Sequence, residues 1–210
     1  MRAVRERQNI LIAGGTSTGK TTLANALLAE IAATGDRVLV LEDTVELQCA
    51  ARDHVPLRTR QGVVSMTELV RSSMRLRPDR VVVGEVRGAE ALDLIKVWGT
   101  GHPGGIATIH AGSALGALLR LEQLILEVAV NPPRALIAEA VNVVIHIAGR
   151  GRKRRIESIA RVVGFDGVGY RLVDWGADAL ETPFPKLPLV SPAVPATALP
   201  LSPDQPGELP

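Results

Sequence analysis

The chain has 210 residues, of which 46% are hydrophobic and 22% charged, with 24 Lys and Arg against 22 Asp and Glu, four His and one Cys. This length and composition support one domain with a real hydrophobic core and exclude a wholly disordered chain. The single Cys49 excludes a disulfide framework and a cysteine-rich zinc ribbon. No apolar run approaches the roughly 18 residues that span a bilayer, and Met1 is not followed by a signal sequence, so a cytoplasmic location is expected.

Composition divides the chain into two parts. Nine of the 14 prolines lie between Pro183 and Pro210. We therefore predict a folded domain over residues 1–175 and a Pro-rich, disordered tail over residues 176–210. The tail holds four acidic residues and one basic residue, a net charge of −3, so residues 1–175 carry +5. Five basic residues of this folded part are concentrated in the segment Arg150–Arg155.

After a charged lead of eight residues, short β-branched runs alternate with stretches of helical periodicity. This alternation predicts an α/β fold with a mostly parallel sheet, helices on both faces and a C-terminal β-hairpin. The predicted strands are Asn9–Ala13, Arg37–Leu41, Arg80–Val83, Ile106–Ile109, Val141–Ala148, Arg155–Val163 and Tyr170–Val173. The predicted helices are Lys20–Ala33 ended by Gly35, a helix from a Ser65/Glu68 capping box to Leu76, Ala89–Trp98, Ser113–Val128, and Pro133–Ala140 capped by Asn131.

Residues Gly14–Thr21 read GGTSTGKT and match the P-loop pattern G-x-x-x-x-G-K-(S/T) without substitution. The match lies between a predicted buried strand and an amphipathic helix, which is the context that this motif requires. Glycines let main-chain N–H groups surround phosphate oxygens at a helix N-terminus. We expect Lys20 to reach the β and γ phosphates of a nucleoside triphosphate and the Thr21 hydroxyl to bind Mg²⁺.

Acidic residues follow two other predicted strands. Glu42 and Asp43 come after the strand that ends at Leu41, where they suit either ligand binding at the edge of the sheet or a turn. Glu85 follows a run of three valines and Gly84, in the form of a Walker B strand whose carboxylate orients water and assists Mg²⁺. We predict a catalytic role for Glu85.

Two histidines accompany the fourth strand. His102 lies in a glycine-rich loop before the strand, and His110 follows the end of it. We expect both to point toward one edge of the sheet, where an imidazole is suited to sensing a γ-phosphate; packing in the core or on the surface is the alternative.

Taken in order, GGTSTGKTT, LEDTVEL, RPDRVVVGEVRG and GTGHPGGIATIHA resemble the Walker A, Asp, Walker B and His boxes of the secretion traffic ATPases. The resemblance covers roughly residues 8–150, and the wording of the last box is most similar to the conjugative-transfer (TrbB-like) branch. It implies a RecA-like P-loop core that hydrolyses ATP with Mg²⁺ in a homo-hexameric ring. It also implies work on the secretion machinery, in the cytoplasm or peripherally at the inner membrane.

Carried over box by box, the resemblance implies roles for particular residues. Glu85, Glu42 and His110 would be catalytic, with Glu85 as general base, and Thr21, Glu85 and Asp43 would hold the metal. An arginine acting between subunits would come from among Arg58, Arg71, Arg75, Arg77 and Arg87, for most of which surface salt bridging is the alternative. The nucleotide would be bound by Gly14, Gly15, Thr16, Ser17, Thr18, Gly19, Lys20, Thr21 and Thr22.

Family members carry an N-terminal domain before the RecA-like core, whereas eight residues precede the first predicted strand here. Three explanations of this difference are open: the chain is a fragment, the choice of start site removed the domain, or the chain is a shortened variant. A type IV pilus or type II secretion assembly ATPase, and a nucleotide-binding subunit that does not hydrolyse ATP, are the alternative functions.

The basic run Arg150–Arg155 suits either a nucleic-acid patch or a solvated hairpin turn. Because glycines flank it and no aromatic residues are interleaved for stacking on bases, we predict the hairpin and no direct binding of nucleic acid.

Overall fold

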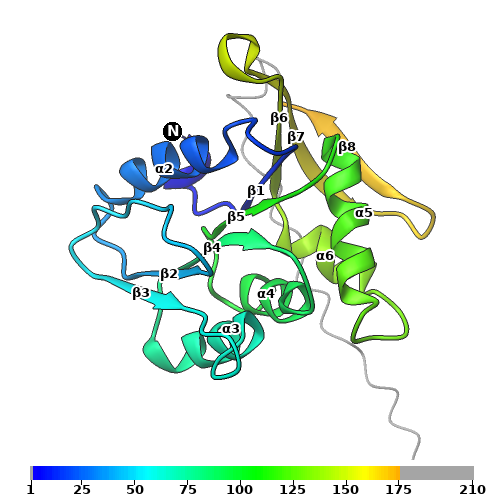
Figure 1. The fold of residues 1–210 in the computed structure, drawn as a ribbon. Coiled ribbons are helices and arrows are strands. Elements are labelled where there is room, and N and C mark those ends of the chain that lie inside the picture. The colour runs from blue at the N-terminus through cyan, green and yellow to red at the C-terminus, as the bar shows by residue number, and fades with distance from the viewer. Residues whose placement is uncertain (1, 176–210) are drawn as a thin grey trace, which may run out of the picture.

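The computed structural model describes residues 2–175, so the predicted tail of residues 176–210 lies outside the described residues. Within them, eight strands form one sheet in the order β3-β2-β4-β5-β1-β6-β7-β8 (Figure 1). The strands are β1 Ile10–Gly14, β2 Val38–Glu42, β3 His54–Arg58, β4 Arg80–Val86, β5 Ile106–Ile109, β6 Val143–Ala148, β7 Arg155–Phe165 and β8 Tyr170–Asp174. The α-helices are α1 Arg2–Arg5, α2 Lys20–Ile31, α3 Met66–Ser73, α4 Glu90–Gly99, α5 Ala114–Ile125 and α6 Arg134–Ala140.

The sheet is parallel from β3 through β6, and β7 and β8 add an antiparallel hairpin at its end. Helices α1 and α2 cover one face, and α3, α4, α5 and α6 cover the other. The predicted α/β fold, with its mostly parallel sheet, helices on both faces and C-terminal hairpin, is therefore confirmed.

Each central strand contributes to two hydrophobic cores. In β1, Leu11 packs against α3–α6, whereas Ile12 packs against α2. The same alternation holds in β2, where Leu39 and Val40 face opposite cores and are almost fully buried. Because both faces are covered, every position must be apolar, which explains the unbroken valine, leucine and isoleucine runs in the sequence.

Two elements were missing from the predicted set. Strand β3 pairs only with β2 at the sheet edge, so its exposure alternates and it tolerates Pro56, whose ring nitrogen has no proton to donate. The short helix α1 lies in what was expected to be a plain charged lead, and it buries Ala3 and Val4 against α2.

Helix ends also differ from the prediction, and α5 stops at Ile125 rather than at Val128. Helix α2 ends at Ile31 and is followed by a turn, so Gly35, with a φ of 76°, belongs to that turn and does not cap the helix. Helix α6 begins after Pro133, without a side-chain cap, so Asn131 does not cap it. The predicted capping box of Ser65 and Glu68 at the start of α3 is confirmed.

At the amino ends of the central strands, a buried arginine joins several segments. Arg80 is 1% exposed, and its Nε lies 2.6 Å from Oδ2 of Asp36. Its two terminal nitrogens donate to the main-chain carbonyls of Gly104 and Val4. Arg7 pairs with the other oxygen of Asp36 at 3.0 Å. This cluster ties α1, β4 and the loop before β5 together, away from the edge that carries the P-loop.

We expect Asp36→Asn to lower the free energy of unfolding by about 2 kcal/mol at pH 7, because it leaves a buried guanidinium without its counter-ion. Burial opposes ionisation of Asp36, but hydrogen bonds from Arg80 and Thr34 outweigh it and hold the pKa of the carboxyl below its ordinary value. The stabilisation is therefore present above about pH 4 and is lost as the pH falls through the lowered pKa. Urea unfolding measured from pH 7 to pH 3 should show the two proteins converging in acid.

The matched control is Asp53→Asn, which removes an exposed pair with Arg37 and should cost less than about 1 kcal/mol. Equal losses in the two variants, or a difference from the wild type that grows in acid, would contradict the account of Asp36.

Candidate nucleotide-binding site

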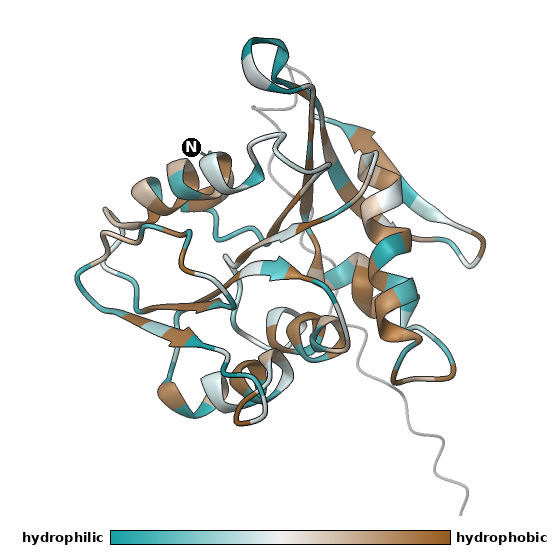
Figure 2. Ribbon diagram, in the orientation of Figure 1, coloured by the Kyte–Doolittle hydropathy of each residue, from teal (hydrophilic) through white to brown (hydrophobic). Residues whose placement is uncertain are grey.

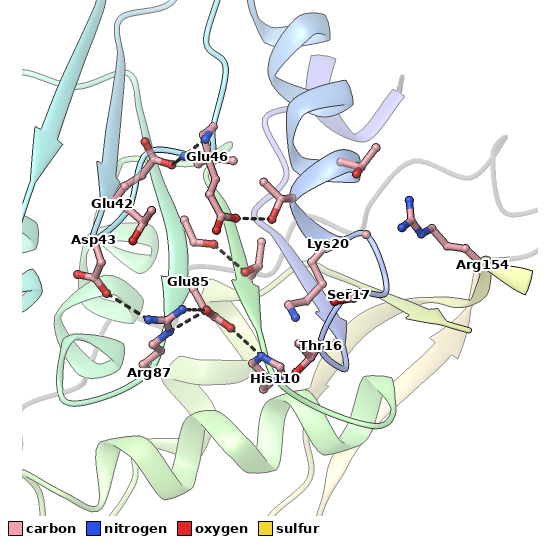
Figure 3. Close-up of a pocket in the computed structure, with 17 residues that line it drawn as sticks. Thr16, Ser17, Lys20, Glu42, Asp43, Glu46, Glu85, Arg87, His110 and Arg154 are labelled. Carbon is pink, nitrogen blue, oxygen red and sulfur yellow. Dashed lines mark hydrogen bonds and ion pairs between the residues drawn. The ribbon is translucent and has the colours of Figure 1, made fainter. Parts of the chain in front are cut away.

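A cavity of about 440 Å³ lies at the carboxyl edge of the parallel strands (Figure 3). The P-loop, the ends of β2, β4 and β5, and one residue from the β6–β7 connection surround it. The residues that line it are Thr16, Ser17, Gly19, Lys20, Thr21, Thr22, Glu42, Asp43, Thr44, Glu46, Leu47, Gly84, Glu85, Arg87, Thr108, His110 and Arg154.

The P-loop joins β1 to α2 in a tight turn. A side chain at Gly14 would lie 2.5 Å from Oγ1 of Thr18 and 2.8 Å from the carbonyl oxygen of Ile147, so only glycine fits there. Gly19 has a φ of 97° and directly precedes the first turn of α2. The free N–H groups of that turn consequently face the cavity, as an anion site at a helix N-terminus requires.

Lys20 is the buried cation of the loop, 8% exposed. Its Nζ donates to the carbonyl oxygens of Gly14 and Gly15, each at 3.1 Å. Burial lowers the pKa of the ammonium, an effect that Glu85 partly offsets and Arg87 adds to. A phosphate bound beside Lys20 would supply the negative charge that favours its protonated form.

The hydroxyl of Thr21, expected to hold Mg²⁺, donates a 2.9 Å hydrogen bond to Oε2 of Glu46. Glu46 lies in the segment after β2, and sequence reasoning gave it no role. A signal for Glu46 was present in the sequence. Glu46 is the third acid of LEDTVE, four positions after Glu42, so it lies in the same short loop after the strand.

Glu42 is the last residue of β2 and Asp43 follows it, and the two have different surroundings. Glu42 is 4% exposed, and its Oε1 accepts hydrogen bonds from the main-chain N–H groups of Glu46 and Leu47, at 3.0 and 2.7 Å. Asp43 accepts a hydrogen bond from the Thr59 hydroxyl at 2.8 Å. Glu42 therefore shapes the turn after β2, while its side chain still lines the cavity.

Glu85 lies within β4, just before Val86, where the pairing of β4 with β5 shifts register. Its Oε2 accepts hydrogen bonds from Nε and Nη2 of Arg87, and Nη1 of the same arginine lies 3.7 Å from Asp43. Nε2 of His110 lies 3.1 Å from Oε1 of Glu85. Among the described residues, no donor makes an aligned hydrogen bond to this buried Oε1.

The expectation that both histidines point to one edge of the sheet is wrong. His110 follows the carboxyl end of β5 and lines the cavity. His102 precedes β5, in the same loop as Gly104 and Gly105, whose N–H groups bind the side chain of Asn9 before β1. That loop lies at the amino edge, because every parallel strand runs from there toward the P-loop edge.

The five arginines considered for a role between subunits do not lie together in the structure. Arg87 alone of the five reaches the cavity. Arg71 pairs with Asp93 on the surface at 3.0 Å, and Arg58, Arg75 and Arg77 are exposed outside the lining. Sequence reasoning instead missed Arg154, which lines the cavity from the basic run.

A glycine-rich strand–helix loop around a buried lysine, facing carboxylates of neighbouring parallel strands, defines the class of P-loop nucleotide-binding proteins. The family described as Type II/IV secretion system protein matches residues 2–155. The chain belongs to this family.

Similar proteins agree with this assignment. The conjugal transfer protein TrbB of Rhizobium radiobacter is 50% identical over 171 residues, covering 80% of this chain and 53% of that protein. The crystal structure of the VirB11 ATPase from the Brucella suis type IV secretion system, in complex with sulphate, has a TM-score of 0.70 at 35% identity and covers 76% of this chain and 50% of that one. The chain thus spans about half the length of these relatives.

The fold is also that of the pilus retraction motor PilT with bound ADP, with a TM-score of 0.57 at 20% identity over 82% of this chain and 48% of that one. These similarities confirm the RecA-like core. Within residues 2–175, no helix has both the length and the apolar composition to cross a bilayer.

We expect Glu42→Ala to lower the free energy of unfolding by about 2 kcal/mol, because two main-chain N–H groups lose their acceptor. Glu42→Gln keeps an acceptor oxygen and should lose less than half as much. Urea unfolding of both variants beside the wild type measures the difference. Equal losses in the two variants, or none in Glu42→Ala, would contradict the role of Glu42 in the turn.

Proposed function

We propose that this chain is the ATP-hydrolysing motor domain of a conjugative or type IV secretion system, working in a homo-hexameric ring. The observation that carries the proposal is the placement of Lys20 and Glu85 in one cavity, on adjoining parts of a P-loop fold. Lys20 provides the cation for a terminal phosphate, and Glu85 provides a carboxylate for the attacking water.

Binding of the nucleotide is the first requirement, and the P-loop N–H groups with Lys20 meet it. The cavity has one more carboxylate than it has cations: Glu42, Asp43, Glu46 and Glu85 stand against Lys20, Arg87 and Arg154. A site with four carboxylates and three cations does not by itself offset the charge of a triphosphate. An added divalent cation would offset part of that charge.

The donors suit Mg²⁺. It prefers oxygen ligands and takes most of them from phosphates and water, so one or two protein groups suffice. No group of three His, Cys, Asp or Glu side chains forms a metal site in residues 2–175, which is compatible with such a shared site. Thr21 and the carboxylates of Glu85 and Asp43 would hold the ion. The Thr21 hydroxyl donates a hydrogen bond to Glu46 in the structure. When bound, Mg²⁺ would neutralise charge on the phosphate oxygens.

Glu85 is the residue we assign as general base. Arg87 holds its Oε2, which leaves Oε1 to accept a proton from water. We assign His110, whose Nε2 lies 3.1 Å from Oε1, a contact with the γ-phosphate. Glu42 contributes to catalysis by keeping the turn that carries Asp43 and Glu46 in position.

The kind of secretion system in which this chain acts is inferred from its relatives. The R. radiobacter protein is named for conjugal transfer, and the B. suis ATPase belongs to a type IV secretion system. We propose that this chain acts on the machinery proteins of such a system, in the cytoplasm or peripherally at the inner membrane. We propose no direct role in binding nucleic acid, because the basic run is a hairpin connection whose Arg154 turns to the P-loop.

We expect Glu85→Gln to lower the steady-state ATPase rate by about 10²–10⁴-fold while ATP binding is retained, because the variant removes the carboxylate that accepts the proton and leaves the P-loop and Lys20 in place to hold the phosphates. A coupled ATPase assay and equilibrium binding of ATP with Mg²⁺ measure the two quantities. Lys20→Ala is the control for the phosphate site and should weaken ATP binding by at least about tenfold.

Binding of ATP without turnover in the wild-type chain would contradict the motor and favour a subunit that binds ATP without hydrolysing it. Normal ATP binding in Lys20→Ala would contradict the phosphate-site assignment.

Assembly is tested separately. We expect the 22.3 kDa chain to form a hexamer when ATP and Mg²⁺ are added, because in the proposed ring a neighbouring subunit completes each site and would cover the exposed pair of Asp43 and Arg87 at the cavity. Light scattering after size-exclusion chromatography, with and without ATP and Mg²⁺, measures the mass. A monomer under all conditions would contradict ring assembly by this chain.

A further inference from the structure

The β6–β7 connection protrudes from the end of the sheet and is strongly hydrophilic (Figures 1 and 2). It contains a short 3₁₀ turn, Gly151–Lys153, between two antiparallel strands. The predicted hairpin is thus confirmed, yet the arginines within it are not alike. Arg155 pairs with Glu157 at 3.0 Å, whereas Arg154 turns toward the P-loop (Figure 3).

Arg154 lies against the last glycine of the P-loop. A Cβ atom on Gly19 would be 2.8 Å from both Cδ and Nε of Arg154 and 2.9 Å from its Cζ. The absence of a side chain at Gly19 is therefore what lets the guanidinium approach the loop. Two segments far apart in the sequence meet here, one from the start of α2 and one from the hairpin.

The guanidinium of Arg154 has no ion pair or side-chain hydrogen bond to any other residue in the described part of the chain. A guanidinium carries five N–H donors in a planar fork that matches phosphate oxygens. Its charge is therefore available to an anion in the same cavity, which Arg154 lines together with Lys20.

The position of Arg154 indicates which phosphates it would meet. Glu85 and His110 line the part of the cavity where hydrolysis would occur, near Lys20. Arg154 lies at Gly19, on the other side of the first turn of α2 from Glu85 (Figure 3). A triphosphate with its terminal group between Lys20 and Glu85 would present its inner phosphates to that side.

We infer that Arg154 is a further nucleotide-binding residue, which donates to the α and β phosphates and so ties the β6–β7 loop to the bound nucleotide. The inference rests on the proposed function, because it needs the P-loop to hold a nucleotide. Its consequence is that occupancy of the site orders a loop whose other basic residues, Arg150, Arg152 and Lys153, are exposed.

Binding of Mg-ADP and Mg-ATP to the 210-residue chain, measured by titration calorimetry, tests the contact. We expect Arg154→Gln to weaken both nucleotides alike, by about ten- to hundredfold, since the α and β phosphates are common to them. The midpoint of thermal unfolding without nucleotide should not change, because Arg154 is exposed and unpaired in the described structure. Arg152→Gln, in the same loop but outside the lining, is the matched control and should bind both nucleotides as the wild type does.

A second readout follows the loop itself, which contains several trypsin cleavage sites. Saturating Mg-ADP should slow tryptic cleavage at residues 150–155 in the wild type and in Arg152→Gln. In Arg154→Gln it should give no protection at the remaining sites, even at saturation.

Unchanged ADP affinity in Arg154→Gln, with normal binding by the wild type, would overturn the role of Arg154 and leave the proposed function standing. A loss confined to ATP would overturn the contact with the inner phosphates. Failure of the wild-type chain to bind either nucleotide would overturn the proposed function together with this inference.

Discussion

The parallel pairing of β2, β4, β5 and β1 is the constraint on which the nucleotide site depends. Because parallel strands end at one edge of a sheet, side chains from four separate segments meet there. Packing on both faces holds the register, since a slip of one residue would exchange the two hydrophobic cores. Where β4 and β5 shift register, the Thr108 hydroxyl donates a 2.6 Å hydrogen bond to the carbonyl oxygen of Gly84. That bond steadies the stretch of β4 that carries Glu85.

Acids that look equivalent in the sequence have different surroundings at this edge. Glu42 is buried and accepts two main-chain hydrogen bonds, so it organises a turn. Glu85 lies between Arg87 and His110, and its Oε1 accepts no aligned hydrogen bond from the described residues. Glu42 also packs against β4, because a Cβ atom at Gly84 would come within 3.2 Å of Cγ of Glu42.

Much of the fold followed from local signals. Unbroken apolar runs marked the buried strands, and the capping box marked the start of α3. Strand β3 was missed because an edge strand needs no such run, and α1 because a four-residue helix carries almost no periodicity. His102 was placed at the wrong edge although the order of elements could have corrected it, since a loop before a parallel strand lies at the amino edge.

The sequence by itself determined the P-loop, because eight contiguous residues and their flanking strand and helix contain all that this motif requires. It also determined that Glu85 would end a buried strand near that loop. Only the tertiary structure decided that Glu46 holds Thr21 and that Arg154 alone of the basic run lies on Gly19. These two contacts join segments that are distant in the chain, so they depend on strand order and on the approach of the β6–β7 connection to the P-loop, which no local pattern specifies.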